Sequence, residues 1–163
     1  MKKSQPIIFV GMMGCGKSSI GKVVSKKLLL NFFDLDNEIE NLFRLSVNKI
    51  FNSFGEQAFR QKEYEILKNL ILKKDVLIST GGGAFCQKKT SSLIRKKCLS
   101  VWLDVDNQII FKRVKNNPKR PLLSGLNDKE LKIRIEALSS ERSQYYKSAD
   151  IRIVLPDQPI LNS

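Results

Sequence analysis

The chain contains no histidine and only three cysteines among its 163 residues. Cys15, Cys86 and Cys98 lack the paired spacing of zinc ligands, and there is no histidine to complete a mixed zinc site. An odd, sparse set of cysteines in a sequence without an export signal indicates reduced thiols. The sequence therefore supports neither a zinc-binding protein nor a disulfide framework.

Long hydrophobic runs are also absent. No stretch approaches the roughly 18 consecutive apolar residues of a membrane-spanning helix. The basic residues 1–6 precede only a short apolar run, which we interpret as a first strand and not as a secretory signal. Hydrophobic content of 42% and charged content of 28% are typical of a globular protein. We expect a single domain, residues 1–163, located in the cytoplasm.

Acidic residues are few compared with basic ones: 16 Asp and Glu against 29 Lys and Arg leave a net charge of +13. Such an excess can indicate nucleic acid, anionic membranes or anionic small substrates as partners. The basic residues are scattered, and aromatic residues do not alternate with them as on a base-stacking surface. We therefore expect no nucleic-acid or membrane partner, and a field that attracts small anions.

What the chain does contain is the segment 11–18, GMMGCGKS, which matches G-x-x-x-x-G-K-[ST]. A short apolar run precedes it, and a segment with an apolar stripe at helical spacing follows. This context indicates a phosphate-binding loop rather than a glycine-rich turn, because backbone N–H groups and a helix N-terminus together hold phosphate oxygens. We expect Lys17 to reach the β- and γ-phosphates and Ser18 to bind Mg²⁺. The chain is predicted to bind a nucleoside triphosphate.

Cys15 lies inside this loop, next to Lys17 and a helix N-terminus. These neighbours can lower the pKa of a thiol, and a loop position suggests that the side chain is accessible without nucleotide. We interpret Cys15 as a small residue at a tolerant position and assign it no redox role.

Short apolar runs alternate with longer segments of helical periodicity, which is typical of a parallel sheet with crossover helices. The predicted strands are residues 7–10, 31–35, 76–79, 99–103 and 151–155. The predicted helices include residues 37–44, 57–72 and 107–115. A last long helix is expected after Asn127, an N-cap that pairs with Glu130 in a capping-box pattern. Residues 115–125, rich in Pro, Asn and Gly, are predicted to form a mobile loop.

Two carboxylates follow the second predicted strand. Alternation along a strand directs Asp34 and Asp36 to the same side, toward the crevice at the carboxyl end of a parallel sheet. One could hold Mg²⁺ through its water shell, and the other could orient and deprotonate an acceptor hydroxyl. Alternatively, Asp36 only caps the following helix.

Two arginines and a glycine run complete the candidate site. Arg60 is either one half of a surface pair with Glu63 or a ligand for a substrate carboxylate, held in place by Glu63. Residues 81–83, three glycines after an apolar strand, either permit close approach to a ligand or form a flexible turn. Arg120, in the predicted loop, could neutralise transition-state charge, and Arg142 could bind substrate. Singly, each of these two would more often be a solvated surface cation.

Together, in this order, the motifs resemble shikimate kinases. The matching segments are residues 11–18, FDLD at 33–36, GEQAFR at 55–60, STGGGA at 79–84, RPLL at 120–123, and Arg142 followed by Tyr146 and residues 149–150. Many nucleotide-binding families share the phosphate loop, but the combination is much more specific. The resemblance implies an α/β protein with a three-layer α/β/α P-loop kinase fold and a five-stranded parallel sheet. It also implies a helical substrate-binding region at about residues 34–61 and a mobile lid at about residues 113–125.

The resemblance further implies transfer of the γ-phosphoryl group of ATP to the 3-hydroxyl of shikimate, a step in chorismate and aromatic amino acid biosynthesis. Mg²⁺ would be the cofactor, ATP and shikimate the substrates, and the protein a monomer. The implied catalytic residues are Asp36, Lys17 and Arg120. The implied ATP ligands are Gly14, Cys15, Gly16, Lys17, Ser18, Ser19, Arg120 and Arg113, the last stacking on adenine. Ser18 and Asp34 would serve the metal. Shikimate would contact Asp36, Arg60, Gly81, Gly82, Gly83 and Arg142, between walls formed by Phe51 and Phe59.

One departure from the family concerns the adenine end. Family members usually continue past the last strand into a terminal helix, whereas residues 156–163 are few and contain two prolines. The adenine pocket of the family normally uses the loop after the last strand, and Pro156 and its neighbours match that loop only weakly. Lower stability, weaker ATP binding and a truncated chain remain open. Two other functions also remain open: a related kinase for gluconate or a nucleoside monophosphate, and a non-catalytic basic module that binds nucleotides or nucleic acid.

Overall fold

The computed structural model of the chain describes residues 5–115, 123 and 125–156. Five parallel strands form one sheet in the order β2-β3-β1-β4-β5. This confirms the predicted α/β class and the five-stranded parallel sheet. The elements are β1 (Ile7–Val10), α1 (Lys17–Lys27), β2 (Asn31–Asp34), α2 (Leu35–Phe43), α3 (Val47–Leu70), β3 (Val76–Ser79), η1 (Ala84–Cys86), α4 (Lys88–Lys97), β4 (Leu99–Val105), α5 (Asn107–Val114), α6 (Asp128–Tyr146) and β5 (Ile151–Leu155).

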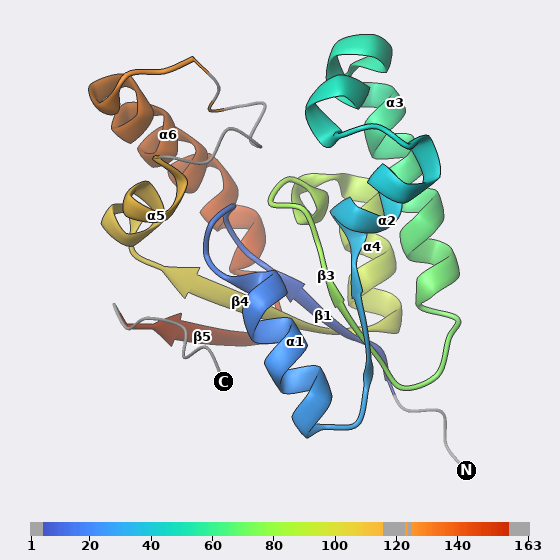
Figure 1. The fold of residues 1–163 in the computed structure, drawn as a ribbon. Helices are drawn as coiled ribbons and strands as arrows, with labels where there is room; N and C mark the ends of the chain where they lie inside the picture. The colour runs from blue at the N-terminus through green and yellow to red at the C-terminus, as the bar shows by residue number, and fades with distance from the viewer. Residues whose placement is uncertain (1–4, 116–122, 124, 157–163) are drawn as a thin grey trace.

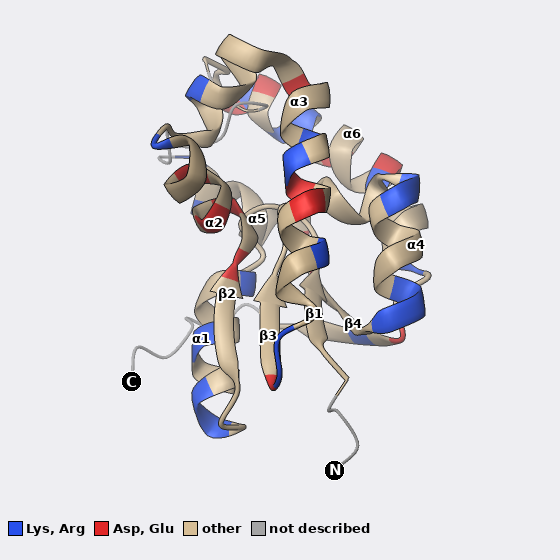
Figure 2. Cartoon of the chain, turned by 90° about the vertical axis from the view of Figure 1, so that its right-hand side faces the viewer, with Lys and Arg blue, Asp and Glu red and all other residues tan. Residues whose placement is uncertain are grey.

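Helices cover both faces of the sheet, as predicted. Figure 1 shows α1 in front of the strands, and Figure 2 shows the strands between α1 on one side and α4 on the other. The central strands are apolar because both of their faces are covered: all four residues of β3 are buried. Lys and Arg residues lie along the outer faces of α1 and α4 (Figure 2), so much of the excess positive charge is on solvated helix surfaces.

Most element boundaries match the predictions, and the exceptions have local causes. β2 ends at Asp34, whose side chain caps α2, so that this helix begins at Leu35 rather than at residue 37. α3 begins at Val47, about one helix turn after α2, and not at residue 57. A kink at Gly55, with φ of 79°, divides α3 within that longer span. The glycine tolerates this left-handed backbone conformation, which interrupts the helical periodicity of the sequence.

The parallel arrangement positions the candidate site. Because all five strands run in the same direction, the segments after β1, β2 and β3 emerge at one edge of the sheet. Those segments carry the phosphate loop, the Asp34–Asp36 turn and the three glycines, respectively. Within the part of the chain that the structure describes, no helix is both long and apolar enough to cross a lipid bilayer.

The capping box of α6 yields a stability prediction. The Asn127 side chain accepts a hydrogen bond from the backbone N–H of Glu130, and the Glu130 side chain accepts one from the Asn127 N–H, at 3.0 and 2.9 Å. Replacing Asn127 with Ala should lower the free energy of unfolding by about 1 kcal/mol, since it leaves a helix N–H without its cap. Urea unfolding would measure this. The control Lys129→Ala, at an exposed position in the same turn, should change stability by less than about 0.5 kcal/mol; equal losses would show that the cap is not responsible.

Candidate active site

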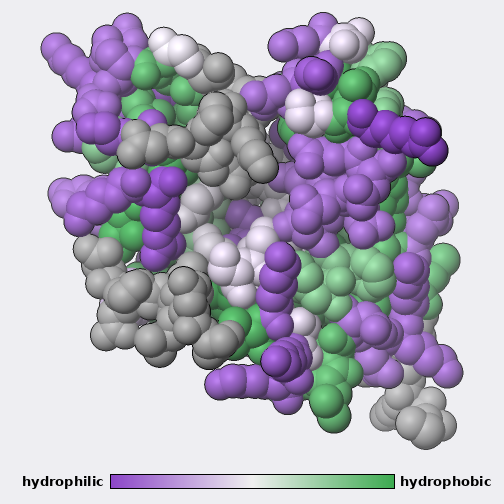
Figure 3. Space-filling model, in the orientation of Figure 1, coloured by the Kyte–Doolittle hydropathy of each residue, from purple (hydrophilic) through white to green (hydrophobic). Residues whose placement is uncertain are grey.

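Two adjoining pockets lie at the carboxyl end of the sheet. The phosphate-loop pocket is lined mainly by residues of the loop, by Asp34 and Asp36 and by Arg113. The arginine pocket is lined by Arg60 and Arg142, by the apolar side chains of Met13, Val47, Phe51 and Phe59, and by Gly83. Asp36, Gly81 and Gly82 line both pockets. Figure 3 shows the hollow in the middle of the molecule, between the side that carries α5 and α6 and the side that carries α3.

The phosphate loop has the backbone geometry that its glycines permit. Gly14 and Gly16 have φ of 75° and 98°, values at which residues with a Cβ are strained. Lys17 is buried, and its Nζ donates to the carbonyls of Gly11 and Met12 at 2.8 Å each. Arg113 Nη1 donates to the Gly14 carbonyl at 3.3 Å. The lysine and the arginine therefore both border the predicted phosphate site.

Cys15 differs from the prediction of an accessible thiol. Its side chain is 0% exposed and belongs to the hydrophobic core. Its backbone N–H donates to the Met12 carbonyl at 3.3 Å, within the turn of the loop. The expectation of an exposed Cys15 was therefore wrong. Cys15 is not among the residues that line the phosphate-loop pocket, and its Sγ lies 3.6 Å from Lys17 Nζ.

Asp34 and Asp36 both reach the phosphate-loop pocket, but not for the predicted reason. Asp34 ends β2 and caps α2, accepting from the backbone N–H groups of Asp36 and Asn37 at 3.1 and 3.3 Å. Asp36 already belongs to the first turn of α2. Strand alternation therefore does not apply to the pair, and Asp34, not Asp36, is the cap. A short carboxylate satisfies the free N–H groups of a helix start, and this ended the strand earlier than predicted.

Two oxygen ligands meet beside the loop. Ser18 Oγ donates to Asp34 Oδ2 and lies 3.4 Å from Ser79 Oγ. Hydroxyl and carboxylate oxygens are ligands suited to Mg²⁺, which usually binds one or two protein oxygens together with substrate phosphates. The residues present thus fit the implied metal. Among the described residues there is no group of three Cys, Asp or Glu that would form an all-protein metal site.

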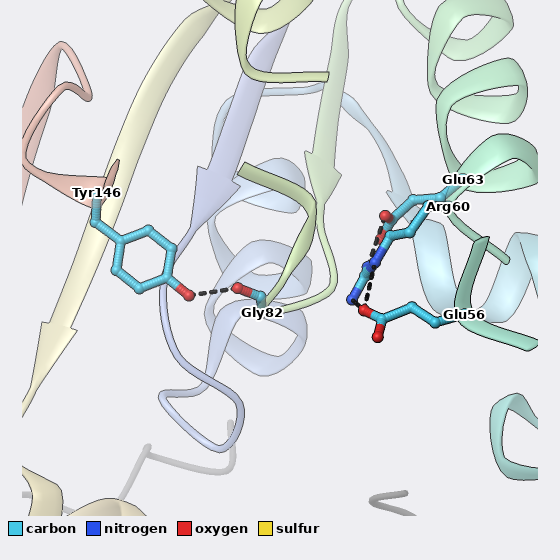
Figure 4. A network of polar contacts seen from close by, with 5 residues as sticks. All are labelled: Glu56, Arg60, Glu63, Gly82 and Tyr146. Atoms are coloured by element: carbon cyan, nitrogen blue, oxygen red, sulfur yellow. Dashed lines mark hydrogen bonds and ion pairs between the residues drawn. The ribbon is translucent and has the colours of Figure 1, made fainter. Parts of the chain in front are cut away.

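Arg60 lies between two carboxylates of its own helix (Figure 4). Its Nη1 donates to Glu63 Oε2 at 2.7 Å, and its Nε and Nη2 donate to Glu56 Oε1 at 3.2 Å each. The guanidinium carbon lies 6.0 and 5.2 Å from the ring centres of Phe51 and Phe59. The sequence left two interpretations of the Arg60–Glu63 pair open. The interpretation as a surface ion pair is excluded, because Glu63 is 0% exposed.

Burial gives Glu63 unusual acid–base behaviour. Loss of hydration disfavours the carboxylate and raises the pKa of Glu63 to about 7, although the Arg60 guanidinium opposes this shift. Glu63 Oε1 has no hydrogen-bond partner among the residues that the structure describes. Arg142, on α6, is also buried, and its Nη1 is likewise unpartnered within the described residues. A ligand carboxylate would satisfy such an arginine.

The three glycines contact the side chains of the site. A Cβ on Gly81 would lie 2.9 Å from Asp36 Oδ1, one on Gly82 would lie 3.0 Å from Arg142 Nη1, and one on Gly83 would clash with Arg60 Nη2. The Tyr146 hydroxyl donates to the Gly82 carbonyl (Figure 4). The segment is therefore a closely packed surface and not a free turn.

Some predicted residues fall outside the described part of the chain, and some residues that line the pockets were not predicted. Arg120 and most of the predicted 113–125 lid lie outside the described residues. Met13, Val47 and Thr80 line the pockets but were not named in the sequence analysis. Met13 occupies a variable position of the loop motif, and Val47 begins a helix that the apolar pattern had placed ten residues later. Neither carries a chemical signal by itself.

Comparison with known proteins agrees with this geometry. The shikimate kinase family model matches residues 13–160. The chain is 37% identical over 154 residues to a shikimate kinase of Rhizobium leguminosarum bv. trifolii (strain WSM2304), covering 94% of this chain and 77% of that protein. Its structure resembles the shikimate kinase of Bacteroides thetaiotaomicron, with a TM-score of 0.87 and 33% identity over 92% of this chain and 86% of the other. It also resembles the Acinetobacter baumannii shikimate kinase in complex with shikimate, with a TM-score of 0.89 and 29% identity over 96% and 86%. The chain belongs to the shikimate kinase family.

Proposed function

We propose that this protein transfers the γ-phosphoryl group of ATP to the 3-hydroxyl of shikimate, producing shikimate 3-phosphate and ADP, in the synthesis of chorismate and aromatic amino acids. The observation that carries the proposal is the pair of adjoining pockets that share Asp36. One pocket has the loop that holds phosphates, and the other has two arginines and apolar walls. A phosphoryl donor in the first pocket and an acid with hydroxyl groups in the second would meet at the Asp36 carboxylate.

The donor would be held by the phosphate loop. Backbone N–H groups of residues 14–19 and the N-terminus of α1 would bind the phosphates, and Lys17 would leave the loop carbonyls to pair with the β- and γ-phosphates. Ser18 and Asp34 would hold Mg²⁺, which when bound neutralises phosphate charge. Arg113, beside Gly14, would stack on the adenine, and Arg120 would add a cation over the phosphates.

The acceptor would lie in the arginine pocket. Its carboxylate would pair with Arg60 and Arg142, the first held by two carboxylates and the second with an unpartnered nitrogen among the described residues. Phe51 and Phe59, with ring centres 4.7 Å apart, would cover a carbocyclic face. The substrate would rest on the backbone of residues 81–83.

The chemistry assigned to Asp36 is proton removal. As the acceptor oxygen forms its bond to phosphorus and the bond to ADP breaks, the hydroxyl proton would pass to the Asp36 carboxylate. With the acceptor bound, its ring and the apolar side chains around it would keep water from the γ-phosphate, which would limit hydrolysis of ATP. Gluconate also carries a carboxylate for the two arginines, but it is an open polyhydroxy chain, whereas the apolar walls of Phe51 and Phe59 suit a carbocyclic face. A nucleoside monophosphate has no carboxylate to pair with Arg60 and Arg142. A non-catalytic nucleotide- or nucleic-acid-binding module has no need of Asp36.

The proposal is tested by comparing acceptors. A coupled assay of ADP release with shikimate, gluconate and nucleoside monophosphates should show turnover with shikimate and only background with the others. Removal of Mg²⁺ with EDTA should abolish the turnover. Activity on another acceptor in the absence of activity on shikimate would contradict the assignment. Salt-sensitive binding to RNA or DNA without any phosphoryl transfer would favour the basic module.

Replacing Asp36 with Asn tests the proton transfer. The amide keeps the size of the side chain and can still hydrogen-bond a hydroxyl, but it cannot accept the proton. We expect kcat to fall by at least about 100-fold, the usual contribution of a positioned base. The Kd for ATP, measured by calorimetry, should stay nearly unchanged. A kcat close to that of the unaltered protein would remove Asp36 from the chemistry.

Replacing Gly83 with Ala tests whether the glycine positions Arg60. The added methyl group would clash with Arg60 Nη2 and displace the guanidinium, so KM for shikimate should rise by about 10- to 100-fold, the cost of a lost charge-assisted hydrogen bond. Arg60→Ala should raise KM similarly. In a double-mutant cycle, Gly83→Ala should add little to Arg60→Ala, because both remove one interaction. Independent, multiplying effects would show that Gly83 acts by another route.

A further inference from the structure

We propose that the binding of shikimate is coupled to the protonation of Glu63. In this role Glu63 is a positioning residue. As a carboxylate it forms an ion pair with Arg60. When it accepts a proton from solvent, that ion pair is lost and Arg60 can pair with the substrate carboxylate instead. The proposal rests on the proposed function of the arginine pocket, and it concerns a residue that the predicted set of substrate ligands does not include.

The first argument is the position of Glu63 beneath the pocket. Its side chain is 0% exposed, and its Oε2 accepts from Arg60 at 2.7 Å. Its other oxygen, Oε1, has no hydrogen-bond partner among the described residues and would lie 3.1 Å from a Cβ on Gly81. The same Cβ would lie 2.9 Å from Asp36 Oδ1. Glu63 Oε1 therefore faces Gly81, which lines both pockets, on the side of Asp36.

The second argument is the balance of charge around Arg60. Glu63 faces Arg60 and Glu56 from its own helix and Asp36 from α2. The Cys86 thiol of η1 lies within electrostatic reach of Glu63, as it does of Arg142 on α6. Arg60 thus already contacts two carboxylates before a substrate carboxylate arrives. A further anion at this guanidinium would repel an ionised Glu63 at close range, and the repulsion is strong because Glu63 is shielded from solvent.

The third argument is that Glu63 can change its protonation near neutral pH, since burial raises its pKa to about 7. A bound acceptor would displace water and add negative charge, and it would draw the Arg60 guanidinium away from Glu63. Each effect disfavours the ionised form, so each raises the pKa of Glu63 further. The complex then holds more protons than the free protein. By linkage, affinity for shikimate is full below the pKa of the free protein and falls as the pH rises above about 7.

The test is a calorimetric count of protons. Shikimate would be titrated into the full chain at pH 7 in three buffers with different heats of ionisation; the slope of the binding heat against the buffer heat gives the protons taken up. We expect uptake of about 0.3 to 0.5 proton per shikimate at pH 7, because Glu63 is about half ionised there, and almost none at pH 5.5, where it is already protonated.

Two variants assign the proton to Glu63. Glu63→Gln is neutral at every pH and keeps a carbonyl acceptor for Arg60, so it should bind shikimate without proton uptake and with an affinity independent of pH from 5.5 to 8.5. Glu56→Gln is the matched control: it changes another carboxylate that contacts Arg60, but one that is 54% exposed. This control should retain the full uptake at pH 7.

The outcomes separate this inference from the proposed function. Uptake that persists in Glu63→Gln, or that is as large at pH 5.5 as at pH 7, would overturn the role of Glu63. Shikimate binding without any proton uptake would also overturn it, while leaving the kinase function intact. Absence of shikimate binding would contradict the proposed function, and this inference with it. Should Glu63→Gln fail to fold, as judged by circular dichroism, the pH series on the unaltered protein decides alone.

Discussion

The site depends on how closely side chains can approach the backbone of residues 81–83. Asp36, Arg142 and Arg60 each lie where the Cβ of a larger residue would stand or would be in contact. These three side chains come from α2, α6 and α3, which are distant in sequence. The absence of three side chains after β3 therefore brings a carboxylate and two arginines to one surface. The glycines act by leaving space, in addition to any backbone contact with a ligand.

Electrostatics in this small volume differs from that of the molecule as a whole. The chain carries a net charge of +13, and helices α1 and α4 place much of it on the solvated surface (Figure 2). The arginine pocket instead contains the Arg60–Glu63 ion pair, in which Glu63 is 0% exposed. Burying a carboxylate without full hydrogen bonding costs free energy, and this raises the pKa of Glu63 to about 7. In the proposed binding mode, this ion pair decides how the substrate carboxylate is held.

The sequence was sufficient for the fold because its strongest signals are local and consistent with one another. The apolar runs that became β1, β3 and β5 have the predicted bounds, and Asn127 and Glu130 form the predicted capping box. The start of α3 was missed, since the helix continues across a kink at Gly55 that breaks the apolar period. The orientation of Asp34 and Asp36 was also misjudged, because a cap at Asp34 ended the strand early. In both places a single residue outweighed the periodic pattern: Gly55 through its backbone conformation and Asp34 through its capping side chain.

What the sequence determined by itself was the inventory of the site: a phosphate loop, two neighbouring carboxylates, two arginines and a glycine run, in an order that resembles one family. Spacing along the chain records those residues, because each motif is set by local backbone chemistry. Only the tertiary structure decided that Cys15 points into the core, that Asp36 lies in both pockets, and that Glu63 is wholly buried beside Arg60. Burial and charge pairing arise from packing between distant segments, and they set the pKa of a carboxyl group whose residue type alone would predict an ordinary one.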